Sequence, residues 1–174
     1  MERKTVVLVV ASQGYQPVEY GDTKKVLEDG GMSVITASNS QDMAVASDNS
    51  TTKVDLTINN LLPDRYDGIF FIGGPGAMDH LDNNVSYSLC KKTVAAGKLL
   101  GAICITPRIL AKAGVLTGKK ATGWDGDNEL AAIFKEHDVT YKKKPVVVDG
   151  KFVTATGPSA AHEFGQTILD LLKK

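Results

Sequence analysis

The amino-acid sequence predicts an α/β/α sandwich, a doubly wound fold in which helices cover both faces of a mainly parallel sheet. Apolar, β-branched runs alternate with stretches of helical periodicity, and most of those stretches end in glycine. Several runs are continuously apolar, which is typical of strands buried on both faces of a parallel sheet. In such a fold the ligand site lies at the carboxyl ends of the central strands.

The expected strands follow from these apolar runs. They cover residues 5–11, 33–37, 68–72 and 99–103, followed by a hairpin of 146–148 and 152–154 that turns at Asp149-Gly150. The hairpin is predicted to lie at the edge of the sheet.

The expected helices lie between the strands and follow the last ones. The first covers 17–29 and opens on Pro17, a residue favoured in the first helical turn. The others cover 85–96, 107–113, 128–137 and 160–172, and Gly97 and Gly114 stop the second and third.

Length and composition bound the function classes. A chain of 174 residues fits a single domain, 1–174, that needs no metal or disulfide to fold. The 20 basic and 20 acidic residues balance, so nothing favours nucleic acid or a membrane as a partner. The two cysteines form no disulfide framework and suit a reducing cytosol, and the short first apolar run is no signal peptide core. We therefore expect a cytoplasmic protein.

Cys104 is the residue on which the functional prediction depends. It follows the 99–103 strand directly, and Pro107 opens the next helix, so the cysteine lies at a strand-to-helix elbow. There its sulfur would face unpaired backbone amides and the positive end of a helix dipole, which favour the thiolate. The alternative is a small buried hydrophobe, as most free cysteines are.

Two further loops are expected at the same sheet edge. The loop after the first strand carries Gln16 and Glu19, and the one after the third is Gly73-Gly74-Pro75-Gly76. The amides of Gly73, Gly74 and Ile105 are candidates for an oxyanion pocket beside the sulfur. An ordinary tight turn uses the same glycines, and Glu19 alone would suit the first turn of any helix.

At these residues the chain resembles the ThiJ/PfpI superfamily of DJ-1-like proteins, nearly end to end. The motifs are Val-Glu at 18–19, Asp-Gly-Ile-Phe-Phe-Ile-Gly-Gly at 67–74, Ala-Ile-Cys at 102–104 with Pro107, and Ala-Gly-Val-Leu-Thr-Gly-Lys-Lys-Ala-Thr at 113–122, followed by Val-Val-Asp-Gly at 147–150 and Thr-Gly-Pro-Ser at 156–159. The resemblance implies a flavodoxin-like sheet with the class I glutamine amidotransferase-like fold.

The resemblance also implies the roles of the site residues. Cys104 corresponds to the nucleophile and Glu19 to the carboxyl that hydrogen-bonds it, with no cofactor or metal. A protonated Glu19 stabilises the thiolate by donating a hydrogen bond, whereas an ionised one repels it. Gln16, Trp124 and His80 are expected to wall the pocket. The implied partners are a small carbonyl substrate and further copies of the chain, as a homodimer or a higher oligomer.

The chain departs from the protease-like branch of the superfamily at two positions. Ile105 stands where that branch has a histidine, and Met78 aligns with a glutamate supplied by a neighbouring subunit. Peptidase activity is therefore not expected. A glutamine amidotransferase triad would need His162 and Glu163, but adjacent residues at a helix start point about 100° apart.

Three functions are left open by the sequence. The first is a cysteine-dependent enzyme that acts on small carbonyl compounds, similar to the superfamily's glyoxalases and deglycases. The second is an oxidative-stress sensor or chaperone-like protein in which Cys104 is oxidised without turnover. The third is a catalytically inactive scaffold.

Overall fold

A seven-stranded sheet forms the centre of the computed structural model, which describes residues 2–174. Its strand order is β11-β12-β8-β7-β1-β3-β6, and only β11 and β12 are antiparallel neighbours. The strands are β1 (Thr5–Val10), β3 (Ser33–Ser38), β6 (Leu56–Thr57), β7 (Gly68–Phe71), β8 (Leu99–Ile103), β11 (Val146–Asp149) and β12 (Phe152–Ala155). The run β3-β1-β7-β8-β12 has the flavodoxin-like order, which confirms the predicted doubly wound fold.

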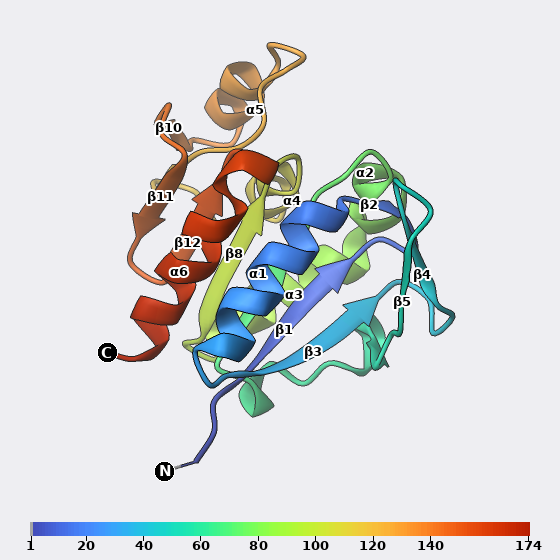
Figure 1. The fold of residues 1–174 in the computed structure, drawn as a ribbon. Helices are drawn as coiled ribbons and strands as arrows, with labels where there is room; N and C mark the ends of the chain where they lie inside the picture. Colours follow the sequence, from blue (N-terminus) through green and yellow to red (C-terminus); the bar gives the residue numbers. More distant parts are fainter. Residues whose placement is uncertain (1) are drawn as a thin grey trace.

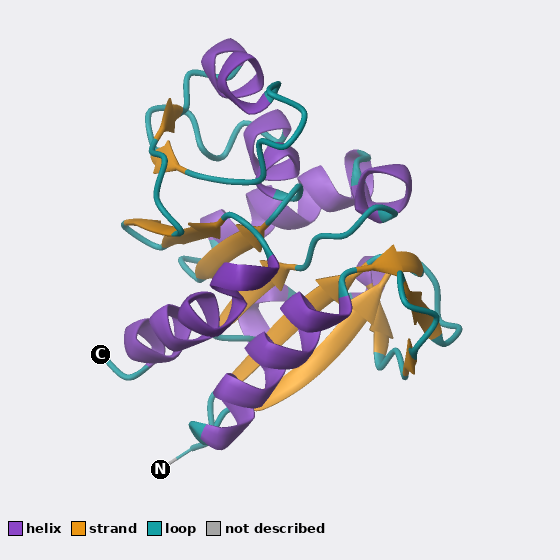
Figure 2. Ribbon diagram, turned by 45° about the horizontal axis from the view of Figure 1, so that its top comes forward, coloured by secondary structure: helices purple, strands orange, loops and turns teal. Residues whose placement is uncertain are grey.

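Helices cover both faces of this sheet. On one face α1 (Pro17–Asp29) packs beside α6 (Ala161–Leu172), and both lie in front of the strands in Figure 1. The opposite face carries α3 (Asn84–Ala95) and α4 (Pro107–Lys112), so that the strands are sandwiched between two helical layers in Figure 2. Two shorter helices, α2 (Ala77–Leu81) and α5 (Leu130–Glu136), complete the chain.

The alternation of side chains along β1 divides the core into two clusters. Val7 and Val9 pack with the α3 and α4 layer, whereas Val6, Leu8 and Val10 pack with the α1 and α6 layer. All five are fully buried. Each such side chain contributes about 2 kcal/mol relative to an exposed one, so a strand apolar on both faces is stable only between two layers.

Several short elements were not predicted from the sequence. One small sheet joins β2 (Gln13–Tyr15), β4 (Ala44–Ala46) and β5 (Thr51–Thr52), and another pairs β9 (Lys120–Ala121) with β10 (Thr140–Tyr141). β6 and α2 were also missed. Strands of two or three residues are too short to show a period, so only tertiary contacts define them.

The longer predicted elements are present, with small shifts at their ends. The 17–29 helix and the 99–103 strand have the predicted bounds. The 128–137 prediction was too long, because α5 begins at Leu130, whose amide donates to Asp125 Oδ1 at 3.0 Å. The 160–172 helix begins one residue later, at Ala161, after a 3-10 turn.

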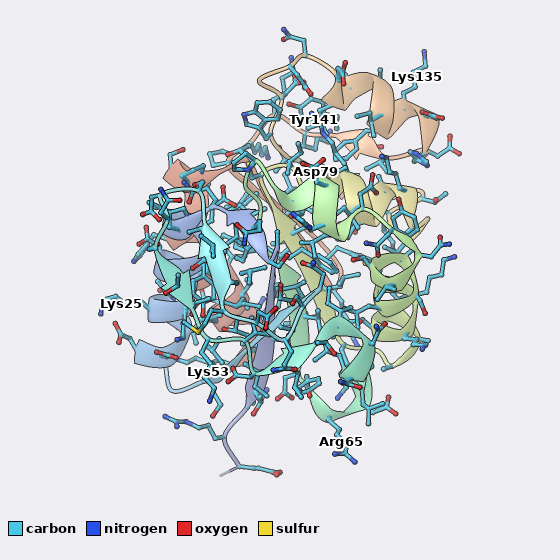
Figure 3. All side chains as sticks on the ribbon, turned by 90° about the vertical axis from the view of Figure 1, so that its right-hand side faces the viewer. Lys25, Lys53, Arg65, Asp79, Lys135 and Tyr141 are labelled. Carbon is cyan, nitrogen blue, oxygen red and sulfur yellow. The ribbon has the colours of Figure 1, made fainter. Side chains whose placement is uncertain are left out.

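The carboxyl ends of β1, β7 and β8 meet at one edge of the sheet. Figure 3 shows Asp79 of α2 and Tyr141 of β10 at this end of the molecule and Arg65 at the opposite end. Between residues 2 and 174, no helix is both long and apolar enough to cross a lipid bilayer.

Candidate active site

Cys104 lies at a strained elbow between β8 and α4. Its φ of 67° is in the left-handed region, which is unfavourable for a residue with a Cβ. The backbone is held on both sides, because the Cys104 amide donates to Ala155 O at 2.9 Å and its carbonyl accepts from the Trp124 amide at 2.7 Å. The side chain is partly buried.

Thr106, which the sequence analysis did not single out, holds the elbow from within. Its Oγ1 accepts from the Ile103 amide at 3.2 Å and lies 3.1 Å from the carbonyl oxygen of Phe71. The hydroxyl is fully buried and therefore ties the ends of β7 and β8 together beside Cys104.

The loop after β1 brings Glu19 to the elbow. Gln16 caps α1, since its Oε1 accepts from the Glu19 amide at 2.7 Å, and its own amide donates to Gly73 O at 2.9 Å. Glu19 is fully buried in the first turn of α1, where its carboxyl is hydrogen-bonded to the Cys104 thiol. The structure thus places Glu19 beside Cys104.

The glycine loop after β7 approaches the pair so closely that no side chain fits. A Cβ on Gly73 would lie 2.6 Å from Cys104 Cβ and 2.8 Å from Glu19 Oε1. The Gly73 amide donates to Glu19 Oε1 at 2.9 Å. It is therefore not free to bind a substrate oxygen, contrary to the prediction of an oxyanion pocket that includes Gly73. The amides of Gly74 and Ile105 face the Cys104 sulfur instead.

The electrostatics of Glu19 are dominated by desolvation. Burial raises the pKa of its carboxyl to about 7, and the hydrogen bonds from the Gly73 amide and the Cys104 thiol only partly oppose this. Oε2 has no nitrogen or oxygen partner. Glu19 is therefore protonated to a substantial extent near neutral pH.

The Cys104 thiol does not ionise as easily as the elbow position alone predicts. Burial, followed by the charge of Glu19, raises its pKa to about 12, and the amides of Ile105 and Gly74 lower it only in part. This corrects the expectation of a thiolate favoured by amides and helix dipole, because burial of the sulfur and the charge of Glu19 outweigh the two amides.

The two groups consequently titrate as a pair. The pKa of the Glu19 carboxyl is raised to about 7 and that of the Cys104 thiol to about 12, so the pair holds one proton over the range between, chiefly on the sulfur. The site holds a nucleophile, an acid–base group and two amide donors.

The three residues expected to wall the pocket lie in different places. Gln16 is partly buried and acts as the α1 cap. Trp124 hydrogen-bonds the elbow through its backbone, and its side chain is 38% exposed. His80 lines a separate hollow of about 150 Å³ with Asn39, Thr57 and Asn83, which is not formed by the elbow.

No second acid–base residue replaces the missing histidine among the contacts of Cys104 in the described chain. His162 and Glu163 are both exposed on the first turn of α6, and Met78 packs against the apolar cluster under α3. Within residues 2–174, no three His, Cys, Asp or Glu side chains are grouped as metal ligands.

An ion pair between a buried arginine and a partly exposed aspartate lies beside the elbow and was missed by the sequence analysis. Arg108 on α4 donates to both carboxylate oxygens of Asp127, at 2.7 and 2.9 Å. The signal was present, because a lone arginine inside the apolar stretch Pro-Arg-Ile-Leu-Ala needs a partner when the helix is buried.

The chain is similar to known proteins along nearly its whole length. An uncharacterized protein of Methanocaldococcus jannaschii is 32% identical, and the match covers 100% of this chain and 85% of that protein. A Pyrococcus horikoshii deglycase is 29% identical over 96% of this chain and 99% of its own, and a glutathione-independent glyoxalase of Caenorhabditis elegans is 25% identical over 98% and 90%.

The fold comparison agrees with the sequence comparison. The crystal structure of a ThiJ/PfpI domain protein from Brachyspira murdochii superposes with a TM-score of 0.92, covering 99% of this chain and 98% of that one at 24% identity. The sequence model of the DJ-1/PfpI family matches residues 4–171 of this chain. The chain therefore belongs to the DJ-1/PfpI family.

Proposed function

We propose that the protein is a cofactor-independent enzyme that acts on small carbonyl compounds, with a glyoxalase-like or deglycase-like activity. The observation that carries the proposal is the hydrogen-bonded Glu19–Cys104 pair at the strained elbow, with the Gly74 and Ile105 amides facing the sulfur. Relatives named deglycase and glyoxalase span nearly the whole chain and support the same chemistry.

The first step is addition of the Cys104 sulfur to an aldehyde carbon. A carbon–sulfur bond forms while the π electrons of the carbonyl become a lone pair on its oxygen. That oxygen receives the one proton that Glu19 and Cys104 hold between them. The Gly74 and Ile105 amides face the reacting centre and can stabilise charge that develops there. The product is a hemithioacetal.

Glu19 then serves as the base on this adduct. With the sulfur bonded to carbon, the carboxylate removes the proton from the former aldehyde carbon of a 2-oxoaldehyde and returns it to the neighbouring carbon, while the hemithioacetal hydroxyl proton moves to the oxygen of that neighbouring carbon. The result is a thioester, and its hydrolysis gives a 2-hydroxy acid and the free thiol. One carbon is oxidised and its neighbour reduced, so no external oxidant is needed.

A redox-responsive protein is the second candidate. Cys104 is partly exposed, whereas Cys90 is fully buried, and the two amides facing Cys104 suit the oxygens of an oxidised sulfur. In this case the sulfur is modified by peroxide without turnover of a carbonyl compound.

Methylglyoxal turnover by the wild type and by Cys104→Ser and Glu19→Gln tests the enzyme. Loss of the nucleophile should reduce turnover to background, and loss of the acid–base group should cost at least about a hundredfold. Glu163→Gln is the matched control, because it makes the same chemical change at an exposed helix start. Equal turnover by all four proteins would rule out this function.

A further inference from the structure

The segment from β9 to α5 lies directly against the nucleophile. Residues 123–127, which we call the strap, begin with Gly123, where a Cβ would lie 3.1 Å from Cys104 O and 3.3 Å from the Pro107 side chain. The next amide, of Trp124, donates to the Cys104 carbonyl at 2.7 Å. The strap therefore covers the backbone of the elbow rather than the sulfur.

Arg108 anchors the strap from the first turn of α4. Its guanidinium makes a bidentate ion pair with Asp127, and Nη2 also donates to Trp124 O at 3.2 Å. The guanidinium carbon lies 5.5 Å from the centre of the Trp124 ring. One side chain thus contacts both the Asp127 carboxylate and Trp124 of the strap.

The arginine of this anchor is buried, whereas its aspartate partner is partly open to solvent. The Arg108 side chain is 6% exposed and that of Asp127 32% exposed, and Nε of Arg108 has no partner. The planar fork of arginine suits a bidentate carboxylate, a geometry that lysine cannot reproduce. Removing the partner of an arginine withdrawn from water in this way is destabilising, because it leaves the buried charge without compensation.

The elbow needs such an anchor because Cys104 is strained. A residue with a Cβ stays at a φ of 67° only when its surroundings fix it. The Cys104 amide is fixed by Ala155 in the central sheet, but its carbonyl is fixed by the strap. The strap in turn belongs to a peripheral segment whose small sheet has only two strands, β9 and β10.

We propose that Arg108 is a positioning residue: through Asp127 and Trp124 it holds the strap on the Cys104 carbonyl and so keeps the nucleophile in its reactive orientation. The inference rests on the proposed function, since it assigns a role in the same reaction. Arg108 itself does not touch the sulfur or the Glu19 carboxyl in any contact of the structure.

The single tryptophan of the chain provides a direct measurement. Protein labelled with heavy-nitrogen tryptophan gives one backbone amide resonance, whose proton is the one bound to the Cys104 carbonyl. In Asp127→Asn we expect this amide to exchange with solvent about tenfold faster than in the wild type, because the strap opens more often. Arg108→Met is the second variant, for the case in which Asp127→Asn folds poorly. It removes the buried charge itself, so no buried charge is left unpaired, and the same faster exchange is expected.

The matched control lies on the same helix. Lys112 of α4 forms an ion pair of 2.7 Å with Asp82, so Asp82→Asn removes a comparable pair that does not contact the strap. Its Trp124 amide should exchange at the wild-type rate. Asp127→Glu, which keeps the carboxylate, should exchange within about threefold of the wild type. Unchanged exchange in Asp127→Asn, or equal acceleration in Asp82→Asn, would overturn the proposal.

Kinetics then separate positioning from binding. Because the contact of the strap is with the Cys104 backbone, Asp127→Asn should lower kcat about tenfold and change KM less than about twofold. Faster exchange with an unchanged kcat would show that Arg108 has only a structural role. A wild type without turnover would refute the proposed enzyme alone, since the exchange measurement needs no substrate.

Discussion

Burying the carboxyl of Glu19 lowers the stability of the fold, and the proposed role of this group as an acid–base residue explains why it is buried. Oε1 is satisfied by the Gly73 amide, but Oε2 has no nitrogen or oxygen partner, and burial raises the pKa to about 7. A group held in this state destabilises the fold whenever it is ionised. Such a conflict is expected at a functional site and is hard to explain as packing alone.

The stability of the protein should therefore depend on pH through Glu19. Its pKa is raised from 4.5 in the unfolded chain to about 7 in the folded one, so the stabilisation is complete below 4.5 and is lost as pH rises through 7. The wild type should lose about 3 kcal/mol more than Glu19→Gln between these limits. Urea unfolding at a series of pH values measures the difference, and parallel curves for the two proteins would contradict it.

Gly73 tests the closeness of the pair without removing a chemical group. Gly73→Ala would place a Cβ 2.6 Å from Cys104 Cβ, which forces the nucleophile away from Glu19. We expect turnover to fall at least about a hundredfold, since a shift of 1 Å has that effect. Gly21→Ala on α1, which has no neighbour within 4 Å, should keep full turnover and melt slightly higher. Similar activity in both variants would disprove the close fit.

At the scale of elements, the contact of α1 with α6 sets the position of Glu19. Gly165 of α6 lies against α1, where a Cβ would be 3.1 Å from Val26 Cβ and 3.3 Å from Thr23 Cα. Small residues let helices approach closely, and α1 is thereby pressed onto the sheet with Glu19 at its start.

Filling this contact should separate the helices. Gly165→Leu should lower the free energy of unfolding by about 2 kcal/mol, the usual cost of overpacking a close interface. Gly21→Leu adds the same side chain to an open position of α1 and serves as the control. Chemical denaturation provides the comparison, and equal stabilities would mean that the interface is loosely packed.

The missed elements show why local sequence has limited reach at this scale. β1, β7 and β8 were predictable because each is a continuous apolar run of at least four residues. β9 and β10 have two residues each and pair across 20 positions of the chain. Their pairing depends on where α5 folds back, as shown by the ring contact of Phe134 with Tyr141 at 5.8 Å.

At the scale of the whole molecule, the two thiols differ in access more than in acidity. The pKa of each is raised to about 12, but Cys90 of α3 is fully buried while Cys104 is partly exposed. Alkylation of Cys90 therefore requires opening of the core, and alkylation of Cys104 does not.

Native-state alkylation with iodoacetamide should consequently label Cys104 first. Since global unfolding of an ordinary domain costs at least about 5 kcal/mol, the two rates should differ by about a thousandfold or more. Mass spectrometry of the digested protein gives both rates, and mild peroxide should show the same order. Comparable labelling would remove the physical basis of the redox alternative as well.

The homodimer implied by the resemblance stays a prediction, which sedimentation equilibrium can measure.

The sequence by itself determined the doubly wound fold and the elbow position of Cys104, because continuous apolar runs and the strand-to-helix junction are local patterns, while the pairing of Glu19 with Cys104 was implied by the resemblance. Only the tertiary structure decided how the site is wired: Gly73 donates to Glu19, Gly74 and Ile105 face the sulfur, and Arg108 holds the strap. It also decided the acidity of the thiol. Desolvation depends on everything packed around a group, so it is a property of the assembled fold that no local pattern contains.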